Sequence, residues 1–301
     1  MSAVLLDGRG LAGTLRASAR ARASALFALR GRPPGIGVLL VSDDPAVVAY
    51  ARGKAKAAAA VGIAHIAVRL PVDSDTSTVL AALVALQADP KVDGVIVELP
   101  LPPNVDATRV LAVIDPAKDA DGAHPVSLGR LAFGLPGPRP ATPAAVVALL
   151  EAAGTQLAGA QAVVVGRSRT VGLPAALMLL ARDATVSICH SRTRDMAALA
   201  RTADVLVVAA GVPELIGPEA VKPGATVVDV GTNWLPEPRA DDPSAGRLVG
   251  DVAFDAVRAV AGRLTPVPGG VGPVTTATLL LSVVALAEAN AASSNAGAPH
   301  R

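Results

Sequence analysis

Short runs of Val, Ile and Leu alternate with longer Ala- and Leu-rich segments along almost the whole chain. Continuous apolar runs separated by segments of helical length are typical of parallel strands that helices cover on both faces. The pattern therefore predicts an α/β protein. It places strands at 35–41, 65–70, 94–99, 162–166, 185–190, 204–210 and 226–231, with a short one at 248–252. It places helices near 11–29, 46–60, 76–88, 172–181, 193–201, 252–260 and 275–289.

The Pro- and Gly-rich stretch FGLPGPRPATP (133–143) interrupts this alternation. Clusters of Pro and Gly mark loops, so the stretch is the best candidate for a domain boundary. The small, polar tail at 291–301 is expected to be disordered.

Composition excludes global disorder. Of the 301 residues, 51% are hydrophobic and only 17% are charged, so most of the chain should be packed. The apolar stretch at 276–287 is shorter than the ~20 residues of a membrane-spanning helix. Asp7 and Arg9 stand where a signal peptide needs an apolar run, so we expect a cytoplasmic protein without a membrane partner.

Charge and cysteine content narrow the function further. The 27 Lys and Arg residues almost balance the 25 Asp and Glu residues, which gives no electrostatic footprint for nucleic acid. Cys189 is the single cysteine, so an internal disulfide is excluded. With no Cys/His cluster in the sequence, we predict no metal site.

A predicted strand meets a predicted helix in AVVVGRSRTVGLP (162–174). Gly166 and Gly172 allow a tight turn, and the helix N-terminus would attract a phosphate. The spacing departs from the usual dinucleotide fingerprint, and a βα turn without a ligand fits equally well. The next strand ends in Cys-His-Ser-Arg without the carboxylate that NAD-binding domains place there. Arg167, Arg192 and the hydroxyls of Ser168 and Ser191 would instead suit the 2′-phosphate of NADP, although solvated loop arginines are the alternative.

Tyr50 and Lys54 are four residues apart and therefore share one face of a predicted helix. A lone helical lysine is most often only a solubilising residue. A lysine partly withdrawn from water between domains would instead donate and accept a proton near neutrality.

Three further segments carry candidate polar groups. Glu98 lies at the carboxyl end of a predicted strand, where parallel sheets bind ligands. Asp119 and Asp121 lie in a Gly/Pro-punctuated loop, where they would bind a ligand or, more commonly, form turns with their own backbone. The loop TPVPGGVGPVT (265–275) would form a rigid binding wall for the substrate or only a domain crossover; its candidate residues are Pro268, Gly269 and Gly270.

Taken together, these motifs resemble the bifunctional methylenetetrahydrofolate dehydrogenase/methenyltetrahydrofolate cyclohydrolase family (FolD type). The resemblance extends from the first helix to about residue 290. The ordered set is Tyr50-x-x-x-Lys54-x-Lys56, LPLP (99–102), KDADG (118–122) with HP (124–125), VVVGRSxxVGxP (163–174), ATVSICHS (184–191) and PVPGGVGP (266–273).

The resemblance implies two α/β domains with the folate in the cleft between them, and usually a homodimer. Residues 1–138 with 274–290 would form the folate-side domain, and residues 139–273 a Rossmann-type NADP-binding domain. Hydride would pass from the methylene bridge of tetrahydrofolate to NADP⁺, and water would then convert the methenyl cation to formyltetrahydrofolate.

The resemblance also implies residue roles. Lys54 would be the general acid/base, Tyr50 would pack on the aminobenzoyl group, Asp121 would anchor the pterin and Asp119 would support the same site. NADP would be held by Gly166, Arg167, Ser168 and Ser191, with Thr232 near the nicotinamide.

The sequence departs from the family pattern at several positions. Glu98 replaces the usual glutamine; the other departures are Val47, Ser127, Ala141 and Thr232. A carboxylate near Lys54 favours its ammonium form, whereas burial opposes it. We therefore hypothesise that the hydrolytic step is impaired or has a shifted pH optimum, and that hydride transfer survives better. A dehydrogenase-only member, a dehydrogenase for another small substrate and a non-catalytic NADP- or folate-binding paralogue stay open as alternatives.

Overall fold

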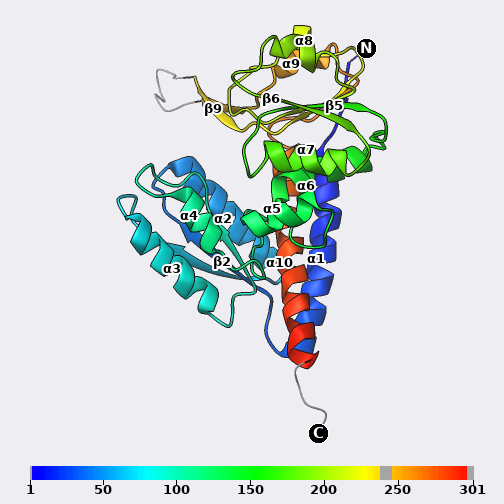
Figure 1. The fold of residues 1–301 in the computed structure, drawn as a ribbon. Helices are drawn as coiled ribbons and strands as arrows, with labels where there is room; N and C mark the ends of the chain where they lie inside the picture. The colour runs from blue at the N-terminus through cyan, green and yellow to red at the C-terminus, as the bar shows by residue number, and fades with distance from the viewer. Residues whose placement is uncertain (1, 238–245, 297–301) are drawn as a thin grey trace. The chain divides into compact units, whose positions relative to one another are not determined.

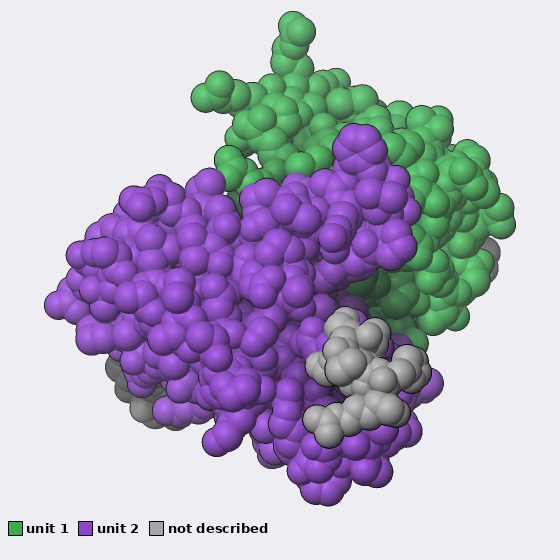
Figure 2. Space-filling view, turned by 60° about the horizontal axis from the view of Figure 1, so that its bottom comes forward, with its two compact units in different colours: residues 1–12, 142–275 green, residues 13–141, 276–301 purple. Residues whose placement is uncertain are grey.

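The computed structural model describes residues 2–237 and 246–296, and the chain divides into two compact units (Figure 2). Unit 1 consists of residues 1–12 and 142–275, and unit 2 of residues 13–141 and 276–301. The first twelve residues belong to unit 1, whereas the family resemblance groups them with the folate-side domain. The reason is a backbone ladder, because β1 (Val4–Leu5) pairs in parallel with β11 (Arg263–Leu264).

Unit 1 is built on a six-stranded sheet in the order β1-β11-β8-β7-β5-β6, in which every neighbouring pair is parallel. The central strands β5 (Gln161–Val165), β7 (Val205–Val208) and β8 (Thr226–Asp229) are almost entirely buried. Continuous apolar runs form such strands because both faces of the sheet are covered. With the edge strand β6 (Thr185–Cys189), they confirm the predicted strands at 162–166, 185–190, 204–210 and 226–231.

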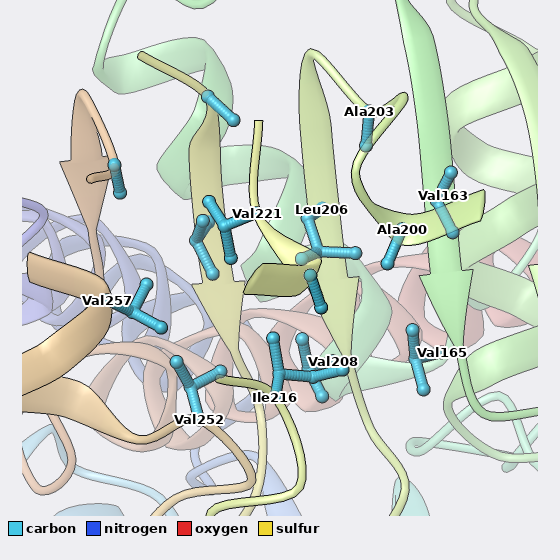
Figure 3. Packing of buried hydrophobic residues seen from close by; sticks show 14 of the residues in the cluster. Val163, Val165, Ala200, Ala203, Leu206, Val208, Ile216, Val221, Val252 and Val257 are labelled. Atoms are coloured by element: carbon cyan, nitrogen blue, oxygen red, sulfur yellow. The ribbon is translucent and has the colours of Figure 1, made fainter. Parts of the chain in front are cut away.

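Helices cover both faces of this sheet (Figure 1). On one face lie α6 (Ala141–Ala152) and α7 (Gly172–Leu180), and on the other lie α8 (Met196–Ala200) and α9 (Phe254–Arg258). Side chains from β5 and β7 meet those of the surrounding loops, the short 3-10 helix η1 (Pro218–Ala220) and α9 in one core (Figure 3). Its members include Val163, Val165, Leu206, Val208, Ile216, Val221, Val252 and Val257.

Unit 2 contains a parallel three-stranded sheet in the order β3-β2-β4. Its strands are β2 (Gly35–Leu40), β3 (Ala64–Arg69) and β4 (Gly94–Val97), as the sequence predicts. Its helices are α2 (Pro45–Ala60), α3 (Thr76–Ala88), α4 (Ala107–Val113) and α5 (Pro125–Ala132), together with α1 (Gly8–Arg30) from residue 13 and α10 (Val271–Ala296) from residue 276.

The two faces of the unit 2 sheet have separate cores. Ile36, Val38 and Ile96 point to one face and pack with residues of α1 and α10. Leu39 and Val95 point to the other face and pack with residues of α3 and α4. The alternation follows directly from the period of two along a strand.

Two charge networks fasten α1 within unit 2. Arg22 donates to both carboxylate oxygens of Glu288 on α10 (3.0 and 2.6 Å), and the two helices lie side by side (Figure 1). The buried Asp93 accepts hydrogen bonds from Arg30, from Arg32 and from a backbone N–H at the start of β2. Burial alone would raise the pKa of Asp93, but these bonds outweigh it and lower the pKa.

Helix α10 departs from the prediction in two ways. The stretch Val271–Ala292 is long and apolar enough, by length and composition, to span a membrane. However, Leu280, Val283 and Val284 on this stretch are almost fully buried in the unit 2 core, so we interpret it as a core helix. The helix also continues to Ala296, which makes residues 291–296 helical rather than disordered. The rest of the predicted tail, residues 297–301, lies outside the described residues.

Several short elements were not predicted. Helices α4, α5 and α6 fill segments for which the pattern gave none, and β9 (Asn233–Pro236) pairs antiparallel with β10 (Gly246–Val249). β10 corresponds to the strand predicted at 248–252. Helices α8 and α9 are shorter than predicted, and Asp195 caps α8 by accepting a hydrogen bond from Ala198 N–H.

Candidate active site and dinucleotide-binding edge

Lys54 and Glu98 form a buried ion pair at the carboxyl end of the unit 2 sheet. Glu98 directly follows β4, and its backbone N–H donates to the Leu39 carbonyl at 2.9 Å, beside the end of β2. Lys54 lies on α2, the helix that follows β2, and its Nζ donates to Glu98 Oε2 at 2.6 Å. The two side chains are only 12% and 3% exposed, so removal of either partner would leave a buried charge without its counterion.

Tyr50 lies beside this ion pair on the same helical face. Lys54 Nζ lies 4.4 Å from the centroid of the Tyr50 ring, within the range of a cation–π contact. The Tyr50 side chain is also hydrogen-bonded to Thr276. Burial raises the pKa of the Tyr50 phenol despite the opposing charge of Lys54. The predicted helical pair therefore combines an ammonium group with an aromatic surface.

Asp119 organises the loop that follows β4. Its Oδ1 accepts a hydrogen bond from Ala123 N–H (3.0 Å), and its Oδ2 accepts from His124 N–H (2.9 Å) and Ser127 Oγ (2.6 Å). The residue is fully buried and forms a bridge with Val95 of β4. Of the two roles considered for Asp119, the geometry shows the turn-forming one, and its support of the substrate site stays a prediction.

Asp121 belongs to the same electrostatic cluster as the ion pair. Burial raises the pKa of Asp121 to about 6, and the charges of Asp119 and Glu98 act in the same direction. The Lys54 ammonium and a hydrogen bond from the Ala141 backbone oppose this rise. Unit 2 thus gathers the predicted residues Tyr50, Lys54, Glu98, Asp119 and Asp121 into one cluster.

His65 is a member of this cluster that the sequence reasoning missed. It lies at the start of β3, and its buried Nε2 has no hydrogen-bond partner in the described part of the chain. Burial lowers the pKa of His65, although the Glu98 charge acts against this. A histidine at the first position of the predicted strand at 65–70 was the available signal.

The candidate phosphate-binding turn lies in unit 1, at the carboxyl ends of the adjacent strands β5 and β6. Gly166 follows β5 and donates its N–H to the Cys189 carbonyl at 2.9 Å. Its φ is +129°, and a Cβ there would lie 2.1 Å from the Ala209 carbonyl oxygen. A Cβ at Gly172 would lie 2.2 Å from the Gly166 oxygen. Backbone segments approach too closely here for any other residue type.

Ser168 closes this turn against the N-terminus of α7. Its Oγ accepts hydrogen bonds from Val171 N–H and Gly172 N–H, each at 3.2 Å. The hydroxyl hydrogen stays available to donate to an anion. The positive end of the helix dipole lies at the same place.

Arg167 and Ser191 are exposed at the ends of the adjacent strands β5 and β6. The position after β6 that would hold an acidic residue in an NAD-binding domain is occupied by His190, Ser191 and Arg192. A glycine turn, a helix N-terminus and an arginine together fit a dinucleotide that carries an additional phosphate.

Two buried aspartates shape the same edge of the sheet, and the sequence reasoning missed both. Asp229, at the end of β8, accepts hydrogen bonds from the N–H groups of Gly231 (3.0 Å) and Asp251 (2.9 Å). Asp251 accepts from Asn233 Nδ2 at 2.8 Å and from two N–H groups in the loop after β7. Thr232 is held between these anchored residues and is itself exposed. An Asp at the end of an apolar run (VVDVG and VGDV) was the signal in both cases.

The loop with Pro268, Gly269 and Gly270 follows β11 and belongs to unit 1, not to unit 2 with Lys54. Gly269 accepts a hydrogen bond from Gly8 N–H at 2.9 Å, and Gly270 N–H donates to the Pro266 carbonyl at 2.8 Å. The loop is therefore fixed at the carboxyl edge of the unit 1 sheet. Its assignment to the substrate stays a prediction.

Together these features define a two-unit α/β protein with a Rossmann-type dinucleotide-binding unit and a separate buried lysine–carboxylate site. Comparison with known proteins then specifies the family. Residues 6–121 match the family description "Tetrahydrofolate dehydrogenase/cyclohydrolase, catalytic domain", and residues 140–291 match its NAD(P)-binding domain. The chain belongs to the tetrahydrofolate dehydrogenase/cyclohydrolase family.

Individual members of this family match the chain over nearly its full length. The "Bifunctional protein FolD" of Sorangium cellulosum is 52% identical, with 97% of this chain and 99% of the relative covered. The FolD structure of Trypanosoma brucei, complexed with NADP cofactor and inhibitor, has a TM-score of 0.91 at 37% identity and covers 97% of this chain and 99% of its own. The Campylobacter jejuni FolD structure has a TM-score of 0.88 at 38% identity and covers 96% and 100%.

Proposed function

We propose that this chain oxidises 5,10-methylenetetrahydrofolate to the methenyl derivative with NADP⁺ and hydrolyses that product to 10-formyltetrahydrofolate. The observation that carries the proposal is the buried Lys54 ammonium, held by Glu98 and covered by Tyr50 at the carboxyl end of a parallel sheet. Unit 2 would supply the groups for the folate, and unit 1 those for the dinucleotide.

NADP⁺ supplies the hydride acceptor when bound. Gly166 and the N-terminus of α7 would hold its pyrophosphate, and Arg167 with Ser191 would hold the 2′-phosphate. Ser168 would donate to a phosphate oxygen, and Thr232 would contact the nicotinamide side. In unit 2, Tyr50 would pack on the aminobenzoyl ring and Asp121 would anchor the pterin.

Hydride transfer removes a hydrogen with its electron pair from the methylene carbon and leaves a methenyl cation. In hydrolysis, the oxygen of water bonds to that carbon and one water proton is released to solvent. The bond from the carbon to N5 then breaks as the Lys54 ammonium gives a proton to N5. The resulting Lys54 amine takes the remaining hydroxyl proton, which leaves the formyl product and restores the ammonium.

A paired assay tests the proposal. One preparation is supplied with methylenetetrahydrofolate and NADP⁺, and separately with methenyltetrahydrofolate, and both product formation rates are measured. Activity in both assays is expected. Hydride transfer without hydrolysis would make the chain a dehydrogenase-only member, and a thermal shift with NADP⁺ without turnover would make it a binding paralogue.

Cofactor preference gives a second test. Replacement Arg167→Ala removes a positive charge that would face the 2′-phosphate, so it should weaken NADP⁺ binding by about tenfold or more and NAD⁺ binding much less. The measurement is the KM for each dinucleotide. Equal losses for the two would contradict the role of Arg167.

We propose a cytoplasmic homodimer as the working form, on the strength of the family resemblance. Light scattering of the purified chain would give twice the monomer mass of 29.9 kDa if this is correct. A monomer would overturn this part of the proposal alone.

A further inference from the structure

Only one of the two oxygens of the Glu98 carboxylate has a hydrogen-bond partner in the described residues. Its Oε2 accepts the hydrogen bond from Lys54 at 2.6 Å, whereas its Oε1 is buried and has no hydrogen-bond partner in the described residues. A buried acceptor of this kind is costly unless a ligand engages it. The folded chain therefore keeps an unsatisfied anionic oxygen at the candidate active site.

The surrounding charges leave this oxygen uncompensated. Lys54 is the cation of the cluster, and burial lowers the pKa of His65, which favours its neutral form. The Asp119 carboxylate accepts hydrogen bonds from three donors of its own loop. Asp121 is a second acid, with a pKa raised to about 6 by burial. The described groups around Lys54 therefore carry more negative than positive charge at neutral pH.

We infer that Glu98 sets the balance between the two reactions, because its carboxylate favours the cationic methenyl compound over its neutral precursor and product. The inference rests on the proposed function and deepens it. Glu98 is a specificity-determining residue for the charge of the one-carbon ligand.

The direction follows from the charge balance of each step. Hydride transfer takes a neutral methylene compound to a cation, so a nearby negative charge stabilises its transition state. Hydrolysis starts from the cation and neutralises it at carbon, so the same negative charge stabilises the starting state more than the transition state. One carboxylate therefore speeds the first step and slows the second.

The test is Glu98→Gln, which keeps the shape of the side chain and removes its charge. We expect the kcat of hydride transfer to fall and the kcat of hydrolysis to rise, each by a factor on the order of threefold to thirtyfold. The affinity for methenyltetrahydrofolate, measured by competition against the methylene substrate, should weaken by a similar factor. Glu98→Asp keeps the charge and should restore the parent ratio of the two rates.

A matched control is Glu288→Gln, which breaks the Arg22–Glu288 pair in the same unit but does not touch Lys54. It should leave the ratio unchanged. If Glu98→Gln does not fold, the parent protein still provides a test, since it should bind the methenyl cation at least about tenfold more tightly than neutral tetrahydrofolate.

The outcomes distinguish failure of the proposed function from failure of the inference about Glu98. A parent protein without hydride transfer would contradict the proposed function itself. An active parent whose Glu98→Gln variant changes both rates in the same direction, or leaves their ratio unchanged, would overturn the inference while the function stands. Equal affinity of the parent for the cation and for the neutral folate would overturn it as well.

Discussion

Replacing Asp121 by asparagine should make the protein more stable at neutral pH but not in acid. Burial raises the pKa of Asp121 to about 6 in the folded state, whereas an unfolded aspartate titrates near 3.9. The folded state therefore binds this proton more tightly than the unfolded state does. By linkage, the stability is greatest below the unfolded pKa and falls as pH rises from about 4 to about 6.

The size of the effect follows from the two pKa values. A difference of about two units corresponds to at most about 3 kcal/mol of destabilisation above pH 6. Asparagine resembles the protonated acid and cannot ionise. The unfolding free energy of Asp121→Asn should therefore equal that of the parent near pH 4 and exceed it by about 2–3 kcal/mol at pH 7.

Urea unfolding, followed by circular dichroism at several pH values, measures this difference. Carboxylates outside the Asp121 cluster titrate in the same range but cancel between parent and variant. Asp73→Asn is the matched control, because it makes the same chemical change at an exposed position of the same unit. A difference in unfolding free energy for Asp121→Asn that is flat with pH, or that favours the parent at pH 7, would show that ionisation of the buried Asp121 does not destabilise the fold. The variant should also lose folate binding, since stability and function often conflict at such positions.

Two further substitutions test the packing on which both sites depend. Gly166→Ala places a Cβ 2.1 Å from the Ala209 oxygen and should abolish NADP⁺ binding, measured by fluorescence titration. The control is Gly154→Ala, at a position with φ +64° and open space around it. It should lower the unfolding free energy by only about 1 kcal/mol and leave NADP⁺ binding intact. Asp93→Asn removes the buried negative charge that pairs with Arg30 and Arg32. It should lower the unfolding free energy, measured by urea unfolding, by about 3–5 kcal/mol. A loss below about 1 kcal/mol would show that this charge network contributes little to stability.

The elements that could be predicted are those whose hydrophobic pattern follows directly from which of their faces are buried. The run at 35–41 is apolar because β2 is the central strand of its sheet and is buried on both faces. Helix α6 was missed for a related reason: it is apolar almost all round, so it shows no period of 3.6. Strand β9 was missed because it is short and half exposed.

The predictable part of the candidate site is the part that is local in sequence. Tyr50 and Lys54 share a helical face through their spacing alone, and Gly166 marks its turn through the strand that precedes it. The pairing of Lys54 with Glu98 spans 44 residues, and it arises only when β2 and β4 become neighbours. Asp229 was overlooked because an Asp in a strand gives no sign of the N–H groups that later surround it.

The two candidate sites occupy the same place in their sheets, but the groups around them have opposite charge. Each lies at the carboxyl ends of parallel strands, where loops can diverge and expose backbone groups. In unit 1 that edge offers N–H groups, a helix N-terminus and the exposed Arg167, which suit an anionic ligand. In unit 2 it offers Glu98 and Asp121 around one buried ammonium, which suit an electron-deficient carbon. Under the proposed function, the same sheet geometry would bind phosphate in one unit and a developing cation in the other, because the side chains that follow the strands differ in charge.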